Sequence, residues 1–152
     1  AKQEHIIQCD LSLKRSGFLE DHQVYHHVIF PAAGFVELSI ASLRELNAQE
    51  GIVLEHLQFI KALELQEQEL QVLISLEADK RYVLKYYSQE EDWVLHAEVT
   101  ASFSGLLKTG CVDLEGLKSR AHAVEVIEDY YQSLASKGLY YGPKFQTIKE
   151  LY

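Results

Sequence analysis

Three histidines, His22, His26 and His27, lie within six positions of one another, shortly before Pro31. Histidine titrates near neutral pH, so each is a candidate general base. Residue type alone favours the ordinary interpretation, a half-buried residue of a strand or loop. His22 and His26 are four apart, a spacing that would let them share a metal ion on one face of a helix. The β-branched residues around them disfavour a helix, and no carboxylate or cysteine completes a ligand set, so we expect no metal.

The position of His22 in the chain favours its interpretation as a general base. Its segment leads into an apolar helix that we expect to begin at Pro31, a residue suited to the first helical position, and to end near Asn47. Backbone N–H groups around Ala33 and Gly34, in the first turn, lack partners within the helix and can stabilise a negatively charged carbonyl oxygen. A base beside such amides is the arrangement that removes a proton alpha to a thioester.

The elements that must position these residues follow from the change in hydrophobic period. After the helix, four segments alternate or have strand length: 52–60, 69–77, 81–88 and 93–103. Short polar connections join them, which predicts an antiparallel sheet, and 5–13 is a further short extended segment. One long apolar helix and such a sheet predict an α+β fold in which the sheet wraps the helix. Residues 104–120 carry three glycines and predict a linker, and a second helix is expected over about 124–137.

Composition excludes several classes of protein. The chain has 152 residues, 47% of them hydrophobic, which is ordinary for a soluble globular domain. Its net charge of -9 argues against nucleic acid or an anionic membrane as partner. Cys9 and Cys111 lack a metal-binding spacing and are expected to be free thiols in the cytoplasm. No segment has the pattern of a signal peptide or membrane span, and the absence of methionine at position 1 suggests a piece of a longer chain.

Three stretches, in the right order, resemble the dehydratase domains of modular polyketide synthases. They are His22 to Pro31, Trp93 to Ala97 and Tyr141 to Phe145. The first resembles the family motif His-x-x-x-Gly-x-x-x-x-Pro with His26 in place of the glycine, the second its tryptophan-to-histidine strand, and the third its Tyr-Gly-Pro-x-Phe signature. The resemblance implies a double hotdog fold. Residues 1–103 would form the first hotdog, 104–120 the linker and 121–152 the start of the second.

The family resemblance also implies an activity. The substrate would be a 3-hydroxyacyl thioester on the phosphopantetheine of an acyl carrier protein, and the product an enoyl thioester and water. The histidine that matches His22 would remove the alpha proton, and an aspartate on the second hotdog would protonate the leaving hydroxyl. Tyr141, with Gly142 and Pro143, would shape the substrate site. The resemblance implies no metal and no cofactor beyond the carrier's phosphopantetheine.

Two departures from the family pattern leave alternatives open. The partner aspartate would lie beyond Tyr152, so the chain alone holds half of the acid/base pair and should not dehydrate a substrate. A side chain at His26, where the family has glycine, can narrow the tunnel or disturb the backbone. The alternatives are an impaired dehydratase-like unit serving as a scaffold or dimerisation element, and an isomerase or cyclase acting on a carrier-bound acyl chain. The expected partners are an acyl carrier protein, the remaining half of the domain and a second copy in a homodimer.

The other notable residues have structural interpretations. We expect His96 to be exposed or satisfied by hydrogen bonds, and Trp93 and Phe103 to belong to the core. Three carboxylates, Glu125, Glu128 and Asp129, are expected to form a solvated first turn of the second helix.

Overall fold

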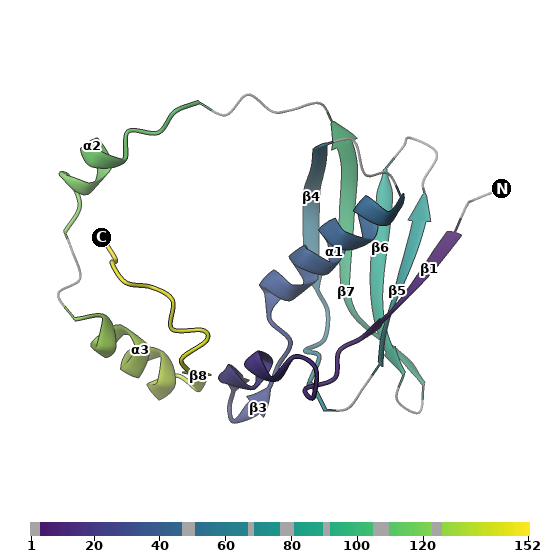
Figure 1. The fold of residues 1–152 in the computed structure, drawn as a ribbon, viewed down its shortest axis with the longest axis horizontal. Coiled ribbons are helices and arrows are strands. Elements are labelled where there is room, and N and C mark those ends of the chain that lie inside the picture. Colours follow the sequence, from purple (N-terminus) through teal and green to yellow (C-terminus); the bar gives the residue numbers. More distant parts are fainter. Residues whose placement is uncertain are drawn as a thin grey trace.

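The structure is a computed structural model that describes residues 4–46, 51–66, 69–76, 81–89, 92–104, 110–122 and 126–152. A large antiparallel sheet is crossed on one face by helix α1, Ala32–Leu46, and a small sheet lies beside it (Figure 1). The predicted α+β hotdog arrangement, with a helix against an antiparallel sheet, is therefore confirmed.

The large sheet has five strands in the order β1-β5-β6-β7-β4, and all neighbours are antiparallel. The strands are β1 Glu4–Asp10, β4 Gly51–Phe59, β5 Glu69–Leu76, β6 Tyr82–Gln89 and β7 Trp93–Ser104. Strands β5, β6 and β7 pair in sequence order because short connections make neighbours in the chain neighbours in the sheet. Strands β1 and β4 form the two edges. The strands predicted from alternation are all present.

Helix α1 buries one face against the sheet. Its buried residues are Phe35, Ser39, Ser42 and Leu43, and the remaining positions are half-buried or exposed. The expectation of a mostly buried helix is correct only for the side that faces the strands. A sheet covers a single side of a helix, so apolar residues elsewhere on α1 are not enclosed by it.

A buried polar contact fixes α1 on the sheet. Ser39 Oγ donates to the carbonyl oxygen of Phe35 at 2.7 Å, and the hydroxyl of Tyr86, from β6, donates to Ser39 Oγ. Tyr86 is fully buried, and burial raises its pKa to about 12. A buried hydroxyl needs its partner, so the contact sets how far α1 can slide along β6.

A β-bulge at His96 changes which side chains of β7 face the core. The pairing of β7 with β6 jumps from Leu95, opposite Tyr87, to Ala97, opposite Tyr86. One extra residue reverses the alternation, so the odd-numbered position Trp93, before the bulge, faces away from α1, whereas the odd-numbered positions from Ala97 to Phe103 face α1. The prediction that Trp93 belongs to the core is therefore wrong, since the residue is 48% exposed. Phe103, beyond the bulge, is partly buried against the core as predicted.

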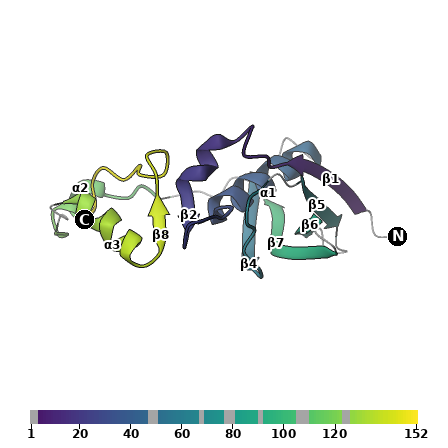
Figure 2. The same ribbon diagram turned by 90° about the horizontal axis from the view of Figure 1, so that it is seen from below.

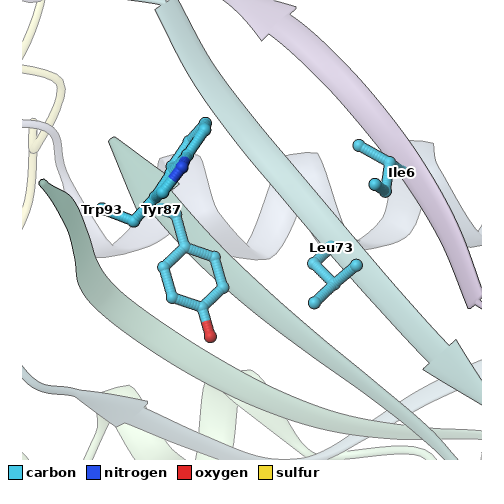
Figure 3. Close-up of a pocket in the computed structure, with 4 residues that line it drawn as sticks. All are labelled: Ile6, Leu73, Tyr87 and Trp93. Carbon is cyan, nitrogen blue, oxygen red and sulfur yellow. The ribbon is translucent and has the colours of Figure 1, made fainter. Parts of the chain in front are cut away.

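The outward residues gather on the sheet face opposite α1. They line a shallow apolar cavity of about 400 Å³, shown in Figure 3, formed by Ile6, Leu73, Tyr87 and Trp93. The rings of Tyr87 and Trp93 meet edge to face with centroids 6.5 Å apart.

The small sheet was not predicted. It consists of β2 His22–Val24, β3 His27–Val28 and β8 Leu139–Tyr141, in the order β3-β2-β8, and follows the short 3-10 helix η1 Gly17–Asp21. Figure 2 shows β8 beside β2. This pairing joins the histidine segment to a strand near the end of the chain.

The segment that leads to β8 is partly helical. Helix α2, Leu114–Lys118, lies within the predicted linker 104–120, and α3, Ile127–Ser136, matches the predicted second helix. Glu128 and Asp129 are exposed in the first turn of α3, as predicted, and Glu125 lies outside the described residues. None of the helices in the described ranges is long and apolar enough to cross a membrane.

Replacing Tyr86 with phenylalanine tests the contact between α1 and the sheet. We expect the free energy of unfolding to fall by about 1 kcal/mol, because the variant loses one buried hydrogen bond. Folding keeps the Tyr86 phenol protonated, so wild-type stability should decline as the pH rises from the ordinary value of 10 toward about 12. The variant should show a smaller decline. Urea unfolding near neutral pH and at alkaline pH measures both effects.

The matched control is Tyr87→Phe, which removes a hydroxyl from the outer face of the same strand and leaves Tyr86 in place. The stability of this variant should decline with rising pH as much as that of the wild type. If the stability of wild type and of Tyr86→Phe fell equally at alkaline pH, the assignment of this decline to Tyr86 would be contradicted.

Candidate active site

His22 lies where η1 ends and β2 begins, and two hydrogen bonds tie it to Ile29. Its Nδ1 lies 2.7 Å from the carbonyl oxygen of Ile29, and the amide of Ile29 donates to the carbonyl of His22 at 3.2 Å. A carbonyl oxygen only accepts, so Nδ1 carries the hydrogen. In the neutral ring, Nε2 then holds the lone pair, which is the arrangement a general base requires.

Two aromatic rings pack on the His22 imidazole. The β2–β8 register places Tyr141 opposite His22, and their rings stack with centroids 5.2 Å apart. The ring of Phe145 lies 5.0 Å away, tilted by 50°. The structure therefore brings His22 and Tyr141 together although they lie far apart in sequence. Together with the bond to Ile29, these contacts restrict rotation of the imidazole.

A tight turn after β8 carries Gly142 and Pro143. The amide of Gly142 donates to the carbonyl of Asp21 at 2.8 Å, and the amide of Phe145 donates back to Gly142 at 2.9 Å. A Cβ on Gly142 would overlap the side chain of Asp21, so the close approach requires glycine. Pro143 is exposed. Gly142 and Pro143 shape the turn that supports Phe145.

A cavity of about 360 Å³ adjoins His22 at the start of α1. Its lining is mostly apolar and includes Ala32, Phe35 and Phe59, with Lys61 as a cationic neighbour. An apolar cavity beside a base suits an acyl chain better than a charged metabolite.

Ala33 and Gly34 line a second cavity, of about 370 Å³, which Phe30 separates from the first. Gly34 has no side chain, and a Cβ there would overlap the Phe30 ring. The amide of Gly34 donates to the carbonyl of Pro31 at 2.8 Å, so it already has a partner. Neither Ala33 nor Gly34 lines the His22 cavity, whereas Ala32, in the same first turn of α1, does.

His26 occupies the loop of the β2–β3 hairpin. Tyr25 and His26 have φ of 49° and 66°, the left-handed pair that a two-residue hairpin turn requires. The exposed His26 ring stacks on Tyr140 with centroids 4.1 Å apart and is not among the residues that line the His22 cavity. The His26 side chain therefore takes no part in lining the cavity beside His22, and the effect of this residue appears instead in the left-handed backbone of the turn. A glycine at this position, as in the family motif, would have indicated a turn with a left-handed backbone. Because this chain has His26 there, the sequence analysis did not predict the hairpin.

Two other histidines have structural partners. His27 Nδ1 lies 2.9 Å from the carboxylate of Glu64 on the surface. His96 is 1% exposed; its Nε2 accepts from Ser88 Oγ at 2.7 Å and its Nδ1 donates to the Lys61 carbonyl at 3.1 Å. His96 is thus satisfied by hydrogen bonds, and the alternative that it is exposed is wrong. Across the described ranges, no group of three His, Cys, Asp or Glu side chains could hold a metal ion.

A helix across an antiparallel sheet, with a histidine beside an apolar cavity at the helix start, defines a protein of the hotdog type. The family model for the polyketide synthase dehydratase domain matches residues 1–89, and the chain belongs to this family.

Solved structures agree with this assignment. The dehydratase domain from the CurF module of curacin polyketide synthase is 29% identical with a TM-score of 0.90, over 97% of this chain and 56% of that one. The CurK dehydratase domain is 30% identical with a TM-score of 0.88, over 97% and 53% of the two chains. The chain thus spans about half the length of these domains.

Curated relatives are whole polyketide synthases. A phenolphthiocerol synthesis polyketide synthase of Mycobacterium marinum is 35% identical over 91% of this chain and 7% of its own length. The mycoketide-CoA synthase of Mycobacterium tuberculosis is 34% identical over 93% of this chain and 4% of its own. The matching region is therefore a small part of each of these proteins.

Substitutions of His26 test its role in the hairpin. His26→Gly relieves the cost of a left-handed backbone and loses the stacking on Tyr140, so we expect the free energy of unfolding to change by less than about 1 kcal/mol. His26→Val should lower it by about 1 to 2 kcal/mol, because a β-branched residue tolerates this conformation poorly. Thermal or urea unfolding measures both variants. Equal stability of the glycine and valine variants would show that the turn conformation is misassigned.

Proposed function

We propose that this chain supplies the general base of a dehydratase that converts a 3-hydroxyacyl thioester, carried on the phosphopantetheine of an acyl carrier protein, to the enoyl thioester. The observation that carries the proposal is the bond from His22 Nδ1 to the Ile29 carbonyl, which leaves Nε2 as the basic nitrogen at the edge of an apolar cavity.

In the proposed reaction, His22 Nε2 takes a proton from the alpha carbon, and negative charge develops on the thioester oxygen. A backbone amide in the first turn of α1, where Ala32 lines the same cavity as His22, stabilises this oxygen. The electron pair forms the carbon–carbon double bond while the bond from the beta carbon to the hydroxyl breaks. The hydroxyl takes a proton from an acid and leaves as water.

The acid is proposed to be an aspartate in the half of the domain that this chain does not span. Two structures of the CurK dehydratase, 29% and 30% identical to this chain, are of inactive mutants, one with histidine replaced by phenylalanine and the other with aspartate replaced by asparagine. Because each of these mutants is inactive, they support a mechanism in which a histidine acts as the base and an aspartate as the acid. A hydroxide is a poor leaving group, so the base alone is not sufficient.

The proposal also covers the substrate site, the partners and the location. The apolar lining of the His22 cavity accepts the acyl chain, and Tyr141 helps to shape the site by packing on the base. The partners are the acyl carrier protein, the rest of the dehydratase domain and a second copy in a homodimer. We propose that the reaction takes place in the cytoplasm and needs no metal.

The test is His22→Phe in a protein that contains the whole dehydratase domain. We expect enoyl formation to fall by about 100- to 10,000-fold, because the variant lacks the base. Mass spectrometry of the carrier-bound product detects the loss of one water. Undiminished dehydration in His22→Phe would refute the proposal.

The matched control is His27→Phe, which replaces an exposed histidine of the same hairpin and should retain activity. A wild-type product of unchanged mass with a moved double bond or a new ring would favour an isomerase or a cyclase instead. Binding of the carrier without any product would favour a scaffold.

A further inference from the structure

Asp21, directly before the base, makes two contacts with the turn after β8. Its carboxylate Oδ2 accepts from the amide of Lys144 at 2.7 Å, and its carbonyl accepts from the amide of Gly142 at 2.8 Å. Asp21 is half-buried, and Gly142 packs so closely on its side chain that a Cβ would overlap it. The contact with Lys144 connects positions 123 residues apart.

The turn that Asp21 holds carries one of the rings on His22. Phe145 follows Lys144 directly, and its ring lies 5.0 Å from the His22 ring and 6.1 Å from that of Tyr141. The opposite anchor of the imidazole is the bond from Nδ1 to Ile29. If the turn moved away, the ring would keep this bond and its stacking on Tyr141 but would lose the packing of Phe145.

We infer that Asp21 is a positioning residue for His22, acting by holding the Gly142–Phe145 turn with its carboxylate and not by touching the substrate. The hydrogen bond from Lys144 requires an acceptor oxygen at this position and no net charge. The effect on turnover rests on the proposed function, whereas the effect on the His22 ring does not.

The first experiment measures the ring without any substrate, in a protein that contains the whole domain. Histidines labelled with ¹³C at Cε1 give one NMR signal each, and His22→Phe identifies the signal of His22. Nearby aromatic rings shift that signal, so Asp21→Ala should move it toward the position of a histidine in water. The buried His96 should be unmoved and reports that the fold is intact. An unmoved His22 signal in Asp21→Ala would overturn the inference.

Two further variants separate the hydrogen bond from charge. Asp21→Asn keeps an acceptor oxygen and should preserve the wild-type signal. Gly142→Ala keeps the charge of Asp21 and displaces its side chain, so it should reproduce the shift seen in Asp21→Ala. If the His22 signal moved as far in Asp21→Asn as in Asp21→Ala, the negative charge of Asp21 and not its hydrogen bond would position the ring, and the inference would fail.

The second experiment measures dehydration. Asp21→Ala should lower kcat about 10- to 100-fold, since a small misplacement of a base is costly, with KM changed by less than about threefold. Asp21→Asn should stay within about threefold of wild type. A wild type that fails to dehydrate would refute the proposed function and leave the NMR result as the test of positioning. An alanine variant with wild-type kcat in an active dehydratase would overturn the inference.

The chain offers a matched control in Asp113. Its carboxylate likewise caps a turn with a close glycine, accepting from the amide of Gly116 at 2.9 Å, but this turn belongs to α2 and not to the small sheet. Asp113→Ala should leave both the His22 signal and kcat unchanged. A loss equal to that of Asp21→Ala would indicate a general effect of removing a capping aspartate and would overturn the inference.

Discussion

The arrangement of the site depends on the hydrogen bond from His22 Nδ1 to the carbonyl of Ile29. A histidine in water exchanges its proton between two nitrogens and rotates freely, whereas this bond assigns the proton to one nitrogen. The other nitrogen is then basic and has a fixed direction. The β2–β3 hairpin supplies the bond, because it folds Ile29 back beside His22. The hairpin loop therefore helps to set the geometry of the candidate site although its side chains do not line the cavity beside His22.

The pairing of β2 with β8 adds the second constraint. It carries Tyr141 to His22, and the turn held by Asp21 brings Phe145 to the same ring. Strands of three residues have little stability by themselves. Side-chain packing and the contacts of Asp21 must therefore contribute to holding β8 in place. This explains why two motifs separated by most of the chain work as one unit.

The large sheet and α1 position the cavity walls. Tyr86 and Ser39 fix the helix on the sheet, and His96 binds the Lys61 carbonyl beside the cavity. The bulge at His96 buries that histidine next to Ala97, which a regular strand would not do. The same bulge turns Trp93 outward. One inserted residue thus supports the cavity wall and exposes an apolar side chain on the opposite face.

The sequence by itself determined the helix, the strands of the large sheet and the family, because hydrophobic period and short motifs are local properties of the chain. It also pointed to His22 and Tyr141. Tertiary structure alone decided the β2–β8 pairing, the burial of His96, the exposure of Trp93 and the role of the Gly142 turn. Each of these features depends either on contacts between residues far apart in the chain or on the β-bulge in β7. Long-range contacts and bulges leave no periodic pattern in the sequence. The hairpin at His26 was hidden for a related reason, since its left-handed backbone is sustained without the glycine that would have revealed it.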